Sequence, residues 1–316
     1  MLIAKKYLLA GILSIPSSSP TMNRLLTLAA VFFAASLASA GDYGHSGKEV
    51  SYTTHFDWRG DFEVSLGHTF LHGNDLEASE ADDYWQADFT LQLGRFLDED
   101  TFFQFDLELD RVLGNEANDS FATGGLLAAH LMKRHQGGGL GVFGGFLVTD
   151  QDDDETDISE RYFLGLEWHD YNPSWTQFAQ VGFFGGEFGS DGEDTIHEAF
   201  FGRVGVRKYL NDSLSIQAEI FGATGLMDVD DQDASVIGFA LITEKQLTDR
   251  STLSLGYSQS RFEQGGERDI INDHYLFVSF KHLFDEGSLI SRDRTSTSLD
   301  LPQLIRWSAL TGGPLE

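Results

Sequence analysis

Cysteine is absent from this chain of 316 residues, which excludes disulfides, thiol nucleophiles and thiolate metal sites. Proline is scarce, with 5 residues against 34 glycines, and Lys and Arg total only 21 against 50 Asp and Glu, for a net charge of −29. Such an acidic chain repels the phosphates of nucleic acids, so we expect no nucleic-acid partner. After residue 40 the sequence also lacks the ~18 consecutive apolar residues of a membrane-spanning helix, which excludes a helical membrane protein.

The first forty residues have the composition of an export signal. They contain no acidic residue and three basic ones. An apolar run over 25–37 follows Arg24, and Ala38-Ser39-Ala40 has the small residues of a cleavage site. We therefore predict Sec-type export with cleavage after residue 40. Met22 is the better start of this signal.

Apolar and polar residues alternate through the rest of the chain in blocks of about ten residues. In the block over 102–112, for example, Phe, Phe, Leu and Leu alternate with Gln, Asp, Glu and Asp. Successive side chains of a strand point to opposite faces, so each block predicts a strand with one apolar and one polar face. The predicted strands lie near residues 61–71, 84–95, 102–112, 121–133, 139–149, 160–170, 175–186, 197–208, 213–224, 235–246, 251–262 and 273–284.

The segments between these blocks alternate between short and long. Between residues 41 and 300 the chain has one proline, Pro173, and it falls in a short segment, as continuous strand pairing requires. A soluble β-sandwich also alternates, but its strands are shorter and its loops lack this rhythm. We predict an all-β fold, a single antiparallel transmembrane β-barrel of about twelve strands with short periplasmic turns and longer acidic outer loops.

The segment from His274 to Phe284 resembles the closing strand of bacterial outer-membrane β-barrels of the porin-like kind. That strand ends in an aromatic residue, preceded by apolar residues at every second position. The matching residues are Leu276, Val278, Phe280 and Phe284, whereas His282 departs from the pattern. The resemblance implies location in the outer membrane, contact with its lipids and lipopolysaccharide, and recognition of the four matching residues by the barrel assembly machinery.

Four segments make up the predicted organisation. They are a signal peptide at 1–40 (of which 1–21 precede the preferred start), a lead-in segment at 41–60, the transmembrane barrel at 61–284 and a C-terminal tail at 285–316. The tail is unusual because porin-like chains normally stop at the terminal aromatic residue. It admits three interpretations: a periplasmic tail, a plug of the barrel, or translation beyond a frameshift. We favour a disordered or loosely docked periplasmic tail.

The polar face of each predicted strand lines the lumen, because the apolar face must contact lipid. The predicted lumen or constriction residues are Asp88, Asp106, Glu108, Asp110, Arg203, Arg207, Gln217, Glu219 and Lys281. The strands near 102–112 and 197–208 are five apart in a ring of about twelve, so we expect the acids of the first to face the arginines of the second across the bore. The centres of the hairpins predict that Asp88 lies opposite Asp110, and that Arg203 lies opposite Glu219.

Two surface features supplement this interpretation. Aromatic residues beside the short turns, namely Phe96, Phe102, Phe103, Trp168, Tyr171, Trp175 and Tyr209, predict a girdle at the periplasmic boundary of the membrane. Acidic runs in the long loops are either solvated charge or weak Ca²⁺ or Mg²⁺ ligands. The candidate ligands are Asp150, Asp152, Asp153, Asp154, Asp228, Asp230 and Asp231.

Together these features predict an outer-membrane channel for passive diffusion of small hydrophilic solutes, leaning toward cations because its mouth is acidic. Two alternatives stay open: a non-conducting structural or surface-binding barrel, and a lipid-modifying enzyme. No nucleophile elbow lies in a strand-to-helix turn, and histidines such as His130 are interpreted as interface or turn residues, so we expect no enzymatic activity. We expect no cofactor beyond weakly bound Ca²⁺ or Mg²⁺. The oligomeric state, monomer or trimer, stays open.

Overall fold

The computed structural model describes residues 58–73, 83–113, 122–135, 137–151, 158–186, 196–227, 233–264, 269–297 and 300–304. The predicted signal, most of the lead-in segment and most of the predicted outer loops lie outside these ranges. Within them, no helix has the length and apolar character needed to cross a membrane.

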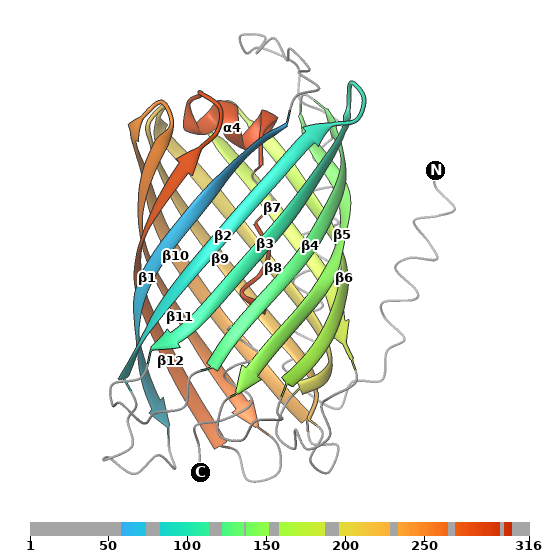
Figure 1. The fold of residues 1–316 in the computed structure, drawn as a ribbon, viewed down its shortest axis with the longest axis vertical. Coiled ribbons are helices and arrows are strands. Elements are labelled where there is room, and N and C mark those ends of the chain that lie inside the picture. The colour runs from blue at the N-terminus through green and yellow to red at the C-terminus, as the bar shows by residue number, and fades with distance from the viewer. Residues whose placement is uncertain are drawn as a thin grey trace. The chain divides into compact units, whose positions relative to one another are not determined.

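In the described part of the chain, twelve antiparallel strands form a closed barrel (Figure 1). Each strand pairs with its neighbours in chain order. The strands are β1 (Arg59–Gly73), β2 (Asp83–Phe96), β3 (Thr101–Leu113), β4 (Ala122–His135), β5 (Gly138–Gln151), β6 (Ile158–Asn172), β7 (Trp175–Gly185), β8 (Ile196–Asn211), β9 (Leu214–Met227), β10 (Asp233–Thr248), β11 (Ser251–Gln264) and β12 (Asp269–Leu283). The predicted fold class and strand count are therefore confirmed.

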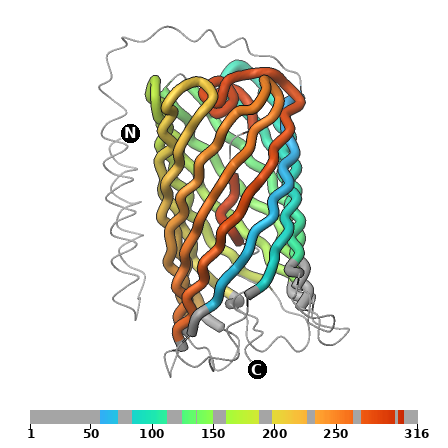
Figure 2. Tube along the Cα trace, turned by 90° about the vertical axis from the view of Figure 1, so that its left-hand side faces the viewer, coloured from blue at the N-terminus to red at the C-terminus, as the bar shows by residue number. Residues whose placement is uncertain are grey.

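The barrel closes where β12 returns to β1, which lie side by side in Figure 2. Leu66 lies opposite Val278 at the middle of this pair. Beyond the strands, the backbone N–H of Phe284 donates to the backbone oxygen of Gly60 at 2.8 Å. A closed sheet leaves no unpaired edge, and this is the condition for placing strands in lipid.

The outer face of the barrel is apolar and exposed. Leu127, Phe146, Leu164, Ile220 and Leu255 expose 45, 68, 66, 55 and 58% of their surface. Exposed apolar residues spread over so many strands suit lipid rather than water. The barrel is therefore transmembrane, as the alternation predicts.

The short turns gather at one end of the barrel, here called the turn end, together with the helix α4 (Leu289–Thr295) (Figure 1). The backbone N–H of Leu289 donates to Asp212 O in the β8–β9 turn at 3.1 Å, and the amide of Gln246 donates to Gly287 O at 2.8 Å. In outer-membrane barrels the short turns are periplasmic. The other end, where β1 ends and β2 begins, is here called the loop end.

Glycines let several inward aromatic rings lie across the neighbouring strand. A Cβ at Gly165 would stand 2.3 Å from Cζ of Phe143, and a Cβ at Gly182 would stand 2.4 Å from Cζ of Phe201. Each pair is directly opposite in register. Aromatic rings laid over strand glycines help to fix the register of a sheet, and here they keep large residues close to the wall.

Candidate functional site

Burial and side-chain contacts place the predicted lumen residues on the inner wall of the barrel. These are Asp88, Asp106, Glu108, Asp110, Arg203, Arg207, Gln217, Glu219 and Lys281. Lys281 illustrates the arrangement, since its Nζ lies 3.0 Å from Oε2 of Glu63 on the adjacent strand. Whether these residues form a constriction stays a prediction.

The acidic part of the inner wall lies on β1 to β3. Asp88 lies opposite Asp110, as predicted. Like charges in that position repel, but the amide of Gln86 donates to both carboxylates, at 2.9 and 2.7 Å. The hydroxyls of Ser65 and Tyr275 also donate to Asp88. Donors shared in this way stabilise the pair without a cation.

His130 links two further carboxylates inside the barrel. Its Nε2 lies 3.0 Å from Asp106 on β3, and its Nδ1 lies 3.0 Å from Glu167 on β6. The ring is fully buried and stacks on Phe143, with the ring centroids 5.5 Å apart. The interpretation of His130 as a turn or interface residue is therefore wrong. Both parities of β4 are rich in small and apolar residues, so alternation gave no signal that His130 faces inward.

The basic part of the inner wall lies on β8. The predicted register is wrong here: Arg203 lies opposite Phe221, and Glu219 lies opposite Gly205. The turn consists of residues 212–213 rather than being centred on Asn211, so every pair shifts by two residues. The charges still meet diagonally, with Nη1 of Arg203 3.6 Å from Oε2 of Glu219.

The C-terminal tail enters the barrel and binds these arginines. Nη1 of Arg207 donates to Oδ1 of Asp293 at 2.9 Å, and its Nη2 donates to Oδ2 of Asp300 at 3.4 Å. Arg203 donates to the backbone oxygen of Asp300, and the amide of Gln180 donates to the same oxygen at 3.0 Å. Asp293 and Asp300 of the tail therefore contact the arginines that the sequence predicted to face an open bore.

Other tail contacts reach strands on different sides of the barrel. Nη1 of Arg134 on β4 donates to the backbone oxygens of Arg294 and Ser296, at 3.3 and 3.1 Å. The hydroxyl of Thr297 donates to Asp61 on β1 at 2.7 Å. The described part of the tail is thus a plug rather than a loosely docked tail. Its own acids and arginines complement the wall, which composition alone did not indicate.

Asp293 is charged in this plug. Burial alone would raise the pKa of its carboxyl group, but the charge of Arg207 and the hydrogen bonds from Thr176 and Tyr209 lower the pKa below its ordinary value of 3.8. The ion pair with Arg207 is therefore complete at neutral pH.

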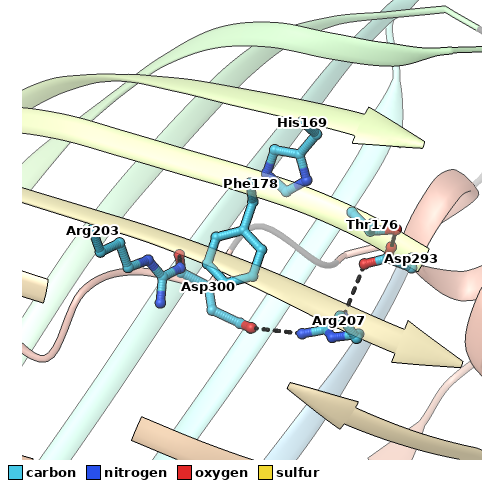
Figure 3. A pocket seen from close by; sticks show the side chains of 7 residues that line it. All are labelled: His169, Thr176, Phe178, Arg203, Arg207, Asp293 and Asp300. Atoms are coloured by element: carbon cyan, nitrogen blue, oxygen red, sulfur yellow. Dashed lines mark hydrogen bonds and ion pairs between the residues drawn. The ribbon is translucent and has the colours of Figure 1, made fainter. Parts of the chain in front are cut away.

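A small cavity remains between the plug and the inner wall (Figure 3). It measures about 10 Å³, room for about one water molecule. Its lining residues are His169, Thr176, Phe178, Arg203, Arg207, Asp293 and Asp300. In Figure 3 the carboxylates of Asp293 and Asp300 both point at Arg207, and a dashed line joins each of them to it. Little free space therefore remains between the tail and the wall beside Arg207.

Toward the loop end the inner wall carries an apolar cluster beside its polar residues. The rings of Phe143 on β5 and Phe201 on β8 have centroids 6.1 Å apart, although three strand pairings separate β5 from β8. Leu304 of the tail belongs to the same buried cluster, and Leu301 packs against it. Because β8 runs toward the turn end, Phe201 lies nearer the loop end than Arg203. Both parities of β4, β5 and β7 are rich in glycine and apolar residues, so alternation could not show which of their residues face inward, and the sequence did not predict this cluster.

The predicted aromatic girdle is largely wrong. Trp175 is exposed, but Phe96, Phe102, Tyr171 and Tyr209 are buried. They pack on the inner face of the wall, next to residues that bind the tail. For example, the guanidinium of Arg134 lies 4.0 Å from the ring centroid of Phe102. Aromatic residues beside turns pack equally well on the inner face, and their spacing does not distinguish the two cases.

The residues of the predicted assembly signal are exposed on the outer face, namely Leu276, Val278, Phe280 and Phe284. This suits the lipid-facing side of a closing strand, and recognition by the assembly machinery stays a prediction. The candidate metal ligands cannot be placed in the same way. Asp152, Asp153, Asp154, Asp228, Asp230 and Asp231 lie outside the described residues, as does the side chain of Asp150. Among the described residues, no group of three or more His, Asp or Glu is arranged to hold a metal ion.

No protein-family model matches the chain, and no curated protein matches it. Among solved structures, an outer membrane channel from Pseudomonas putida F1 superposes with a TM-score of 0.53 at 14% identity, covering 75% of this chain and 100% of that chain. The translocator domain of the autotransporter NalP from Neisseria meningitidis superposes with a TM-score of 0.45 at 13% identity, over 81% of this chain and 96% of that chain. The TodX monoaromatic hydrocarbon channel gives 0.42 at 9% identity, over 72% and 90%.

The last two likenesses are too distant to support an argument, and the first shows the fold alone. That fold, together with the exposed apolar exterior, defines the class of protein. The chain is a closed twelve-stranded antiparallel β-barrel whose apolar outer face suits a membrane, and it shares this fold with the outer membrane channel from P. putida F1.

Proposed function

We propose that the chain is an outer-membrane channel for passive diffusion of small solutes, and that it catalyses no reaction. The observation that carries this proposal is that the C-terminal tail, rather than the barrel wall, closes the bore. The bore is filled at the turn end by the C-terminal tail, a segment outside the barrel wall, and not by the wall side chains alone. Because the tail is held by side-chain hydrogen bonds and ion pairs and is not a strand of the barrel, it can leave the bore without unfolding the wall. The P. putida F1 protein that shares the fold is described as a channel, which agrees with this proposal.

For small ions, we propose that the open channel leans toward cations. Asp88, Asp106, Glu108 and Asp110 lie on the inner wall of β2 and β3. Fixed acids in a narrow bore concentrate cations and repel anions. The reversal potential of the open channel in a salt gradient would show this preference by its sign. A reversal potential of anion sign would contradict it.

The extent of the tail contacts favours a second candidate, a barrel that never conducts. Arg134, Arg203 and Arg207 all hold the tail in place. If the tail never leaves, the barrel is structural. The two candidates predict different solute permeability once the tail is weakened.

Swelling of proteoliposomes tests the proposal. The folded chain from Gly41 to Glu316 and its Asp293→Asn, Asp300→Asn variant would be reconstituted and placed in isosmotic glycine or arabinose. The proposal expects faster swelling with the variant than with protein-free vesicles. Swelling at the protein-free rate, with the variant shown to be folded by its heat-dependent gel migration, would favour the structural barrel.

A further inference from the structure

The tail segment from Asp300 to Leu304 combines two chemistries within five residues. Its acid group lies on Arg207, at 3.4 Å, and its backbone oxygen accepts from Arg203. Leu301 and Leu304 pack against the apolar cluster nearer the loop end. The inner wall therefore holds, side by side, a site for a carboxylate and a site for an apolar group.

The carboxylate site is built by the wall itself. Arg207 is positioned by Gln217, which accepts from its Nε at 2.8 Å, and Arg203 by Gln180, which accepts from its Nε at 2.7 Å. Both arginines thus present their remaining N–H groups toward the bore. A guanidinium held in this way is well suited to bind a carboxylate.

The surroundings of this site select for a single negative charge. Glu219 lies 3.6 Å from Arg203, and Glu167 accepts from Gln180 at 3.3 Å. A second negative charge on the ligand would meet these acids in a region of low dielectric constant. A neutral ligand would leave the arginines without the partner that Asp300 now supplies.

An apolar group attached to the carboxylate has a matching surface. The ring of Phe178 lies under the guanidinium of Arg203, 5.2 Å from it, and lines the cavity in Figure 3. Two residues before Arg203 on β8, toward the loop end, Phe201 belongs to the apolar cluster that includes Leu304. A compact aromatic or aliphatic group would lie there.

We infer that Arg203 and Arg207 form a binding site on the solute path for small monocarboxylates that carry an aromatic or aliphatic group, and that Asp300, Leu301 and Leu304 occupy this site as an internal competitor. The inference rests on the proposed function, because it needs a path by which such a solute enters the bore. It also reconciles this site with the acidic wall: inorganic ions respond to the whole lumen, whereas an organic acid is held at one place.

Calorimetry with phenylacetate on the folded chain from Gly41 to Glu316 tests the inference. The Asp300→Asn variant should bind phenylacetate about fivefold more tightly than the unaltered chain, since one partly buried ion pair of the competitor is removed. The Arg203→Gln, Arg207→Gln variant should lose binding. Asp98→Asn, which alters an acid in an exposed turn, is the matched control and should leave the affinity unchanged.

Phenylacetamide, which has the same ring without the charge, should bind neither chain measurably. Equal affinity for the amide and the acid would overturn the inference, and so would an Asp300→Asn affinity equal to that of the unaltered chain. These two comparisons decide the matter even if the arginine variant does not fold. If the proteoliposomes swell but phenylacetate does not bind, the carboxylate site is wrong and the channel stands. If phenylacetate binds but the proteoliposomes do not swell, the carboxylate site stands and the channel is wrong.

Discussion

Replacement of His130 should destabilise the barrel strongly. Replacing it with alanine leaves Asp106 and Glu167 buried without the ring that lies 3.0 Å from each of them. Removal of one partner from a buried ionic cluster costs about 3–5 kcal/mol. We expect His130→Ala to lower the free energy of unfolding by that amount, measured by urea unfolding followed by tryptophan fluorescence.

The exposed His135 at the β4–β5 turn provides the control. His135→Ala should change the free energy of unfolding by less than about 0.5 kcal/mol. Equal effects of the two substitutions would show that the buried cluster contributes nothing to stability.

At this scale the sequence predicts which face a residue occupies, but not which residue it touches. Alternation placed Asp106 and Arg203 correctly on the inner wall. It could not pair Asp106 with His130, because both faces of β4 are rich in small and apolar residues and its parity is ambiguous. It also gave Arg203 a partner two residues away from the true one, Glu219 instead of Phe221, because the register of a hairpin depends on where its turn begins.

Among the strands, β6 and β7 depend on glycines that accept a ring. Gly182→Ala on β7 would bring a methyl group within 2.4 Å of Phe201 Cζ and 2.8 Å of the backbone oxygen of Leu164. Overpacking of this kind costs about 1–3 kcal/mol, and we expect that loss in urea unfolding. Gly125→Ala is the control, since its nearest neighbour would be Leu109 at 3.6 Å. If both variants unfold at the same urea concentration, the ring is not held against the glycine.

The tail as an element should resist proteolysis only while it is docked. Arg292 and Arg294 are buried in the plug. Neutralising its two anchoring acids in Asp293→Asn, Asp300→Asn should raise the rate of trypsin cleavage after these arginines about tenfold or more, because cleavage follows the population of the released form. Mass spectrometry of the fragments identifies the cut sites.

Glu286→Gln is the matched control for this experiment, because Glu286 pairs with Arg250 at an exposed site outside the bore. Its cleavage rate should equal that of the unaltered chain. Rapid cleavage of the unaltered chain after Arg292 would mean that the tail is not docked.

Twelve strands could be predicted from the sequence because most of them carry their own period-two signal, as 102–112 does for β3, and the others are apolar blocks of similar length. The plug could not, since α4 has seven residues and no alternation. What holds the tail is complementarity between Asp293 and Arg207, 86 residues apart. Such pairing becomes visible only when the barrel brings the C-terminal tail next to β8.

Acid should release the tail and so open the bore of the barrel. The pKa of Asp293 is lowered by Arg207 in the docked state, so its contribution to docking is present above the ordinary value of 3.8 and is lost as pH falls through the lowered pKa. Bilayer current through the unaltered chain should therefore stay low from neutral pH down to about 3.8 and should rise at lower pH. Asp293→Asn should remove this contribution to the pH dependence. An opening centred near neutral pH would assign the control of docking to another group.

Single-channel recording in planar bilayers tests most directly whether the tail closes the solute path. The folded chain from Gly41 to Glu316 would be compared at neutral pH with its Asp293→Asn, Asp300→Asn variant and with Glu286→Gln. We predict that the unaltered chain and Glu286→Gln stay mostly closed, while the double variant opens in discrete steps. Equal, large conductance in all three would contradict closure by the tail, and silence from a correctly folded double variant would contradict the channel itself.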